Sequence, residues 1–141
     1  MPNNLDTVNV YKLVKEYESG KLIYPVAQRD LIMKYLKFSA NGRCLSFSLI
    51  AKNSSYTSFQ LKESDLNPND INSRKKYYFS KDGKNIEIES FVYGEGYGLY
   101  TTLNYVIDNS GDTITYTGPY TKSIYVKEKI PATWKKYKVD W

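Results

Sequence analysis

Residues 85–93 read Asn-Ile-Glu-Ile-Glu-Ser-Phe-Val-Tyr. Successive side chains of an extended strand point to opposite faces, so Ile86, Ile88 and Val92 share one face of this stretch. The turn-forming sequence Lys-Asp-Gly-Lys precedes it, and Gly-Glu-Gly-Tyr-Gly follows it. The pattern predicts a β-strand that belongs to an antiparallel meander.

Segments of the same kind recur on both sides of this strand. They are separated by further turn signals, including the hairpin dipeptide Asn-Gly, and they cover residues 44–51, 57–61, 76–80, 99–108, 113–120 and 122–130. The chain has only four Ala and is rich in Tyr, Thr, Ile and Val, which also favours sheet over helix. We therefore predict a curved antiparallel sheet of about six strands, either cone-like or closed into a small barrel.

The N-terminal residues have a different periodicity. Val10, Leu13, Val14 and Tyr17 recur at the spacing of a helical stripe, and a potential Asp cap precedes them. The spacing predicts a helix over residues 7–19. The fold class predicted for the chain is therefore α+β, with an N-terminal helix packed on the sheet.

A second helix is one of two interpretations of residues 25–36. Their apolar side chains are so dense that periodicity cannot distinguish a helix from a strand. We expect a single domain over residues 1–141, in which residues 1–38 are helical or mixed. The antiparallel sheet covers residues 39–130, and a basic and aromatic tail covers residues 131–141.

The absence of histidine excludes several kinds of chemistry. The chain has 141 residues, no His and one Cys. Catalysis by Ser-His-Asp or Cys-His, the usual catalytic zinc sites and a disulfide within the chain all need residues that are missing. We expect no catalytic residue, no metal and no cofactor, and we favour a protein that is not an enzyme.

The charge and the compartment are less specific. The net charge is +5 and the isoelectric point is about 9.1, which favours anionic partners without requiring one. No window is apolar enough for a membrane span, and no segment resembles a signal peptide, so we expect a soluble protein. The single Cys favours the cytoplasm over a secreted mature domain.

Basic and aromatic residues alternate in residues 34–38, 74–79 and 134–138. Single-stranded nucleic acids and sugar polymers bind such surfaces, because rings stack on bases or sugars and cations pair with phosphates. An amphipathic strand with Lys outside and Tyr inside has the same pattern. Both interpretations stay open, as does the question of whether the fifteen Tyr form core or surface.

The loop expected at residues 94–98 is a further candidate contact, because Tyr97 lies between glycines that let it adapt to a partner. Together with two of the basic and aromatic stretches, this loop supplies the candidate binding residues. They are Arg74, Lys75, Lys76, Tyr77, Tyr97, Trp134, Lys135, Lys136 and Tyr137.

The leading functional hypothesis is a non-enzymatic binding module for a protein partner, of the kind expected in a phage, mobile-element or host-interaction accessory protein. The alternatives are a binder of an anionic or sugar polymer and a small-ligand or enzyme pocket inside a cone-shaped sheet. An exposed strand edge would also allow a homodimer. Cys44 alternates with Ser46 and Ser48, so we expect it on the less buried face, as a packing residue or a reactive thiol.

Overall fold

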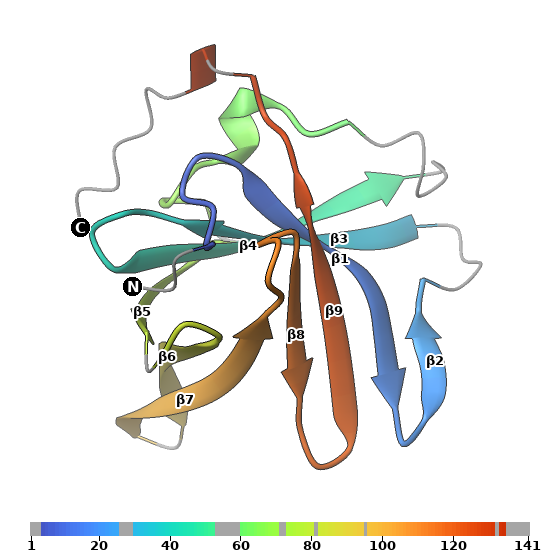
Figure 1. The fold of residues 1–141 in the computed structure, drawn as a ribbon, viewed down its shortest axis with the longest axis vertical. Helices are drawn as coiled ribbons and strands as arrows, with labels where there is room; N and C mark the ends of the chain where they lie inside the picture. Colours follow the sequence, from blue (N-terminus) through green and yellow to red (C-terminus); the bar gives the residue numbers. More distant parts are fainter. Residues whose placement is uncertain are drawn as a thin grey trace.

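The computed structural model describes residues 4–25, 30–52, 60–70, 73–80, 82–94, 96–131 and 133–134. Its strands are β1 (Val10–Glu18), β2 (Lys21–Tyr24), β3 (Asp30–Phe38), β4 (Arg43–Lys52), β5 (Ser73–Ser80), β6 (Asn85–Gly94), β7 (Tyr97–Ile107), β8 (Thr113–Thr117) and β9 (Thr121–Glu128). They form one antiparallel sheet in the order β2-β1-β3-β4-β5-β6-β7-β8-β9, and β1 also pairs with β9. Eight strands therefore close into a barrel, and β2 extends the sheet beside β1 (Figure 1).

The predicted α+β class is wrong, because the described residues contain strands and short 3-10 turns such as Glu63–Asp65. The antiparallel meander in the second half of the chain is confirmed, with strand ends that differ by a few residues. The strand expected at residues 57–61 lies largely outside the described residues, and residues 60 and 61 are not in a strand. No helix in the described ranges is long and apolar enough to cross a lipid bilayer.

The helix expected at residues 7–19 is replaced by β1, which contains a β-bulge. Leu13 lies opposite Tyr125, but Lys15 lies opposite Ile124, so one extra residue is inserted between them. Residues before the bulge are buried on both faces of the strand, and the extra residue then shifts the alternation. Buried apolar residues on both faces of β1, together with the one inserted residue, give the i, i+3, i+4, i+7 spacing that is also typical of an amphipathic helix.

Residues 30–36 belong to β3, so the helix interpretation is wrong there and the strand interpretation is confirmed. From Met33 to Phe38, both faces of β3 are buried or partly buried. Leu36 and Phe38 point into the barrel, whereas Met33 and Tyr35 belong to a second apolar cluster outside it. A strand buried on both sides has no polar alternation, which is why periodicity could not identify it.

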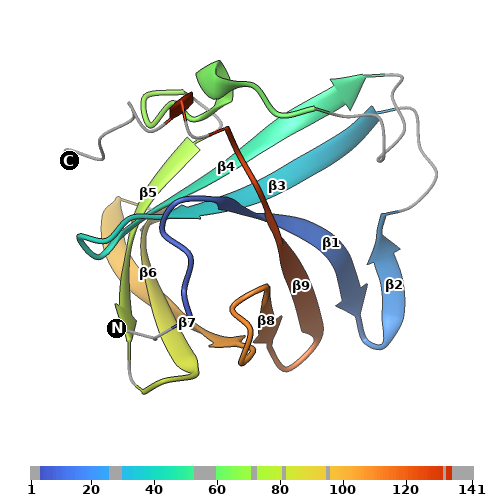
Figure 2. The same ribbon diagram turned by 45° about the horizontal axis from the view of Figure 1, so that its top comes forward.

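The inner cluster fills the barrel. It combines aromatic and aliphatic side chains from nearly every strand and from the N-terminal segment: Leu5, Tyr11, Leu13, Tyr24, Leu36, Phe38, Cys44, Tyr78, Ile86, Ile88, Tyr105, Ile107, Ile114 and Tyr125. Figure 2 shows the strands that surround this core. An eight-stranded barrel is just wide enough for side chains to fill it, and these residues do so.

The outer cluster covers the opposite face of the β3–β4 hairpin. Its buried members are Val10, Met33, Tyr35, Leu45, Phe47 and Leu66, and Leu49, Leu61, Ile130 and Trp134 pack against them. The rings of Tyr35 and Phe47 stack with centroids 5.2 Å apart. The connection after β4 and the segment after β9 therefore lie over the outside of the hairpin, as both figures show.

The ladders between strands differ greatly in length. β6 and β7 are paired over ten residues each, and β3 and β4 over nine. In contrast, β1 and β3 share two residue pairs, β7 and β8 three, and β5 and β6 four. The strands consequently diverge toward the end that carries the β1–β2, β6–β7 and β8–β9 turns, which we call the lower end (Figure 1).

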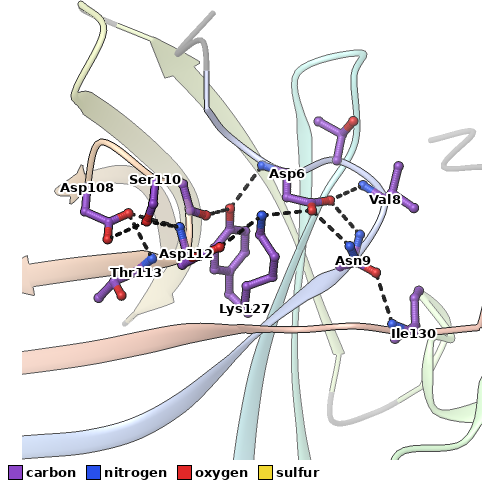
Figure 3. Close-up of polar contacts among 12 residues, drawn as sticks. Asp6, Val8, Asn9, Asp108, Ser110, Asp112, Thr113, Lys127 and Ile130 are labelled. Carbon is purple, nitrogen blue, oxygen red and sulfur yellow. Dashed lines mark hydrogen bonds and ion pairs between the residues drawn. The ribbon is translucent and has the colours of Figure 1, made fainter.

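The upper end is covered by the N-terminal segment through the polar contacts drawn in Figure 3. The Asp6 carboxylate accepts hydrogen bonds from the backbone N–H groups of Val8 and Asn9, at 2.7 and 2.8 Å. Lys127 Nζ lies 3.2 Å from Asp6 Oδ2 and 3.4 Å from Asp112 Oδ1. These contacts attach the segment before β1 to the last strand and to the turn before β8.

Two further contacts fix this closure. The Tyr11 hydroxyl donates to the carbonyl oxygen of Gly111 at 2.8 Å and accepts from the Asp6 N–H at 3.0 Å. Gly111 has φ of 78° and lies directly against the backbone of Asn4, where a Cβ atom would overlap it. A glycine is required there both by the positive φ and by the close approach.

We expect Asp6→Asn to lower the free energy of unfolding by about 1–2 kcal/mol at pH 7, because the variant loses an ion pair and charged hydrogen bonds. Burial would raise the pKa of Asp6, but the hydrogen bonds from Asn9 and Val8 and the Lys127 ammonium outweigh it, so the pKa lies well below its usual range. A carboxyl with a lowered folded-state pKa stabilises the fold above its unfolded pKa, and this stabilisation is lost as the pH falls.

The difference in the free energy of unfolding between Asp6→Asn and the parent protein should therefore be constant near neutral pH and shrink below about pH 4. Urea unfolding at several pH values measures it. Glu18→Gln is the control, because Glu18 is exposed at the end of β1. A difference that persists unchanged at pH 2 would contradict this role of the Asp6 charge.

Cys44 is fully buried in the inner cluster, so the expectation that it lies on the less buried face is wrong. Burial raises the pKa of its thiol to about 12, and the nearby Lys76 and Lys37 only partly oppose this. We expect no reaction with a disulfide reagent at pH 8 in the folded protein and one thiol per chain after denaturation. Rapid labelling of the folded protein would contradict the burial of Cys44.

Candidate functional site

The candidate residues on β5 divide between the two faces of the strand. Arg74 lies opposite Ser46 and Lys76 lies opposite Cys44, so both share the inner face with the buried Tyr78. Lys75 and Tyr77 alternate with them and lie on the outer face. The contiguous sequence Arg-Lys-Lys-Tyr is therefore split into two separate surfaces.

The remaining candidates do not join either surface. Residues 94–98 do not form an open loop, because Gly94 pairs with Tyr97 and Tyr93 pairs with Gly98. The side chain of Tyr97 lies outside the described residues. Trp134 is partly buried against the outer cluster, and Lys135, Lys136 and Tyr137 lie outside the described residues.

The outer surface of β5–β7 presents four exposed rings, which we call the aromatic face: Tyr77, Phe79, Phe91 and Tyr100. Their exposed fractions are 41%, 51%, 49% and 64%. The register places Tyr77 opposite Glu89, Phe79 opposite Glu87 and Phe91 opposite Tyr100, so the rings occupy adjacent rows of one surface. Scattered exposed apolar residues are ordinary, but rings gathered on one face indicate a contact surface.

Two of these rings are held in place by their neighbours. Phe91 and Tyr100 contact each other edge to face, with centroids 5.1 Å apart. The Phe91 ring also lies directly over Gly98, where a Cβ atom would overlap it. The absence of a side chain at Gly98 thus leaves room for the exposed ring of Phe91. At the opposite margin, the Arg43 guanidinium lies over the Tyr77 ring, 5.6 Å from its centroid.

Sequence reasoning selected Tyr77 but missed Phe91 and Tyr100. The alternation of β6 contained a usable signal, since Phe91 shares its face with Glu87 and Glu89, on the side expected to meet solvent. A large apolar residue at a solvent-facing position of an otherwise regular strand suggests a binding surface. Tyr100 lies opposite Phe91 because the turn between β6 and β7 is tight, and this turn was not predicted from the sequence.

Three cations lie on the inner face of β3–β5: Lys34, Arg74 and Lys76. Lys34 lies opposite Ser48, and Arg74 lies opposite Ser46. The residue of β3 opposite Ser46 is the buried Leu36, so Lys34 and Arg74 lie in different rows on the two sides of β4. Arg74 and Lys76 were selected from the sequence as members of a continuous basic run, whereas Lys34 was expected in a different stretch.

A groove of about 560 Å³ lies between the end of β1 and the β8–β9 turn. Tyr17, Tyr120, Lys122 and Ile124 contribute to its walls. Its lining contains no carboxylate and no thiol, so it offers surface contact and no acid–base pair. Tyr120 is 74% exposed and lies on a different part of the barrel from the aromatic face.

The described ranges contain no group of three or more Cys, Asp or Glu side chains that could hold a metal ion. Comparisons with models of protein families, with curated proteins and with solved structures all give no match for this chain.

Proposed function

We propose that this protein is a non-enzymatic binding module that holds a protein partner on its aromatic face. The observation that carries this proposal is the clustering of four exposed rings on the outer surface of β5–β7. Aromatic residues supply large contact areas at low entropic cost and often dominate the energy of protein interfaces. The rigid strands below them, and the seat of Phe91 on Gly98, mean that little ordering is needed on binding.

The charge of this surface indicates the chemistry of the partner. Glu87 and Glu89 lie between the rings on the same face. Carboxylates in this position repel phosphates and attract lysine and arginine. The partner surface that fits is therefore apolar at its centre and basic beside it, although the chain as a whole has a net charge of +5.

The other two hypotheses fit the geometry less well. A polymer binder needs rings and cations on one surface. Arg74 and Lys76 lie on the opposite face of β5 from Tyr77. Arg43 and Lys75 do lie on the outer face, but Glu87 and Glu89 lie between its rings and would repel a polyanion. A deep pocket at the centre of the barrel would compete with the side chains of the inner cluster, which fill it. The closed ring of eight strands has no continuous sheet edge, so a homodimer formed through a strand edge would use β2, which has β1 as its single strand neighbour in the described sheet.

Site-specific photo-crosslinking tests the proposal. We expect a photoreactive phenylalanine derivative at Tyr100 to give one discrete protein adduct in the native cells, because Tyr100 is the most exposed ring of the aromatic face. The matched control is the same derivative at Tyr120, which is also exposed but lies elsewhere on the barrel. Adducts that are the same at both positions, or a smear at both, would contradict a specific interface.

The purified partner then provides a quantitative measurement. Loss of a central aromatic contact costs about 2 kcal/mol or more, so Phe91→Ser and Tyr100→Ser should each weaken binding by at least about tenfold. Tyr120→Ser should leave the affinity unchanged. Glu89→Lys should weaken a basic partner as well, and unchanged binding by all three variants of the aromatic face would refute the proposal.

A further inference from the structure

The groove at the lower end of the barrel is a candidate site that is separate from the aromatic face. Its volume of about 560 Å³ lies in the usual range of ligand pockets. The lining combines the rings of Tyr17 and Tyr120 with the ammonium group of Lys122 and with the hydroxyl groups of Ser and Thr side chains. Rings, a cation and hydroxyl groups therefore meet on one surface.

The register of three strands explains how these side chains meet. Tyr125 belongs to the inner cluster, so the alternation of β9 places Ile124 and Lys122 on the outer surface. Tyr17 of β1 pairs with Lys122, and Lys122 pairs with Thr117 of β8, so these three residues share one row of that surface. Cross-strand neighbours of this kind are close enough to contact the same ligand.

The two turns that border the groove are attached to each other. Ser19 and Gly20 connect β1 to β2 with φ of 50° and 80°, as in a tight two-residue hairpin turn. The Ser19 N–H donates to the carbonyl oxygen of Tyr120 at 2.7 Å, and the two turns lie side by side in Figures 1 and 2. Pro119 restricts the backbone next to Tyr120. A groove that is held in this way needs little ordering when a ligand binds.

The charge of the groove is positive and is not neutralised by its own lining. The Lys122 side chain is exposed and makes no hydrogen bond or ion pair with the described part of the chain. Lys15 is also exposed and lies in the neighbouring row. Glu16 and Glu18 flank Tyr17, but alternation places them on the opposite face of β1, and neither lines the groove. The groove therefore attracts an anionic ligand.

We infer that this groove binds a sugar that carries a carboxylate, such as a uronic acid. The apolar CH face of a pyranose ring packs on the ring of Tyr120 or Tyr17, and the carboxylate pairs with the Lys122 ammonium group. The hydroxyl groups of Ser19 and Thr117 donate to and accept from the sugar hydroxyls. The described lining contains no arginine, whose planar fork is the group that matches phosphate oxygens, so a carboxylate fits better than a phosphate.

Methyl glucuronide and methyl glucoside form a matched pair of probes, because the second has a hydroxymethyl group in place of the carboxylate. Titrations followed by NMR chemical shifts measure both affinities. We expect methyl glucuronide to bind with a dissociation constant of about 1 mM or below. Methyl glucoside should bind about fivefold more weakly, since it lacks the charged hydrogen bond to Lys122.

Two variants separate the contribution of the charge from that of the ring. Lys122→Met should reduce the preference for the charged sugar to less than about twofold, because it keeps most of the side chain and removes its charge. Tyr120→Ser should weaken both sugars by about fivefold or more, and it should fold normally because Tyr120 is 74% exposed. Lys129→Met is the matched control, because Lys129 is exposed beyond the end of β9 and does not line the groove.

Four outcomes would overturn the inference. Equal affinity of the parent protein for the two sugars would mean that the carboxylate is not recognised. Equal loss of preference in Lys122→Met and Lys129→Met would mean that the sugar is attracted by net charge alone. Tighter binding of adenosine monophosphate than of methyl glucuronide would assign the groove to nucleotides. The fourth is the absence of binding at about 20 mM methyl glucuronide. Because Lys122 and Tyr120 lie outside the aromatic face, each of these results leaves the protein-binding proposal to its own test.

Discussion

The space enclosed by eight strands has to be filled by side chains, and in this chain tyrosine fills much of it. The inner cluster contains Tyr11, Tyr24, Tyr78, Tyr105 and Tyr125, and Tyr116 packs against it. Tyrosine combines a large apolar ring with a hydroxyl that needs a partner, so it suits positions near the ends of a barrel. The hydroxyls of Tyr11 and Tyr78 donate to carbonyl oxygens at the upper end. A chain with only four Ala can therefore still build a dense core, and tyrosine is a principal core residue of the described part of the chain.

The sequence allowed the second half of the barrel to be predicted better than the first. In β6 one face is buried and the other meets solvent, so alternation identifies the strand. In the first half of β1 and in residues 33–38 of β3 both faces are buried or partly buried, because the outer cluster covers what would otherwise be the solvent side. Alternation then disappears, and the bulge before Lys15 adds a false helical spacing. Which strands receive an outer cover depends on contacts between distant segments, and local periodicity does not contain that information.

The candidate surfaces also depend on contacts between segments that are distant in the sequence. Composition identified the region around residues 74–77, but the alternation of β5 separates Arg74 and Lys76 from Lys75 and Tyr77. The rings join Phe91 and Tyr100 from β6 and β7, whereas the cations join Lys34 from β3. Each surface consists of residues that the register brings together from separate strands. Sequence reasoning could name some members of both surfaces but could not assign them to different faces.

The pairing of β1 with β9 also fixes the order in which this fold is completed during synthesis. The last residue of β1, Glu18, pairs with Thr121, so 103 further residues must be added before the closing strand begins to emerge. At about 5–20 residues per second this interval lasts roughly 5–20 s. The strands from β3 to β8 pair with their neighbours along the chain and can form hairpins as they emerge. During that interval one edge of β1 lacks its partner, and a nascent chain is exposed there to pairing with other chains or to capture by a chaperone.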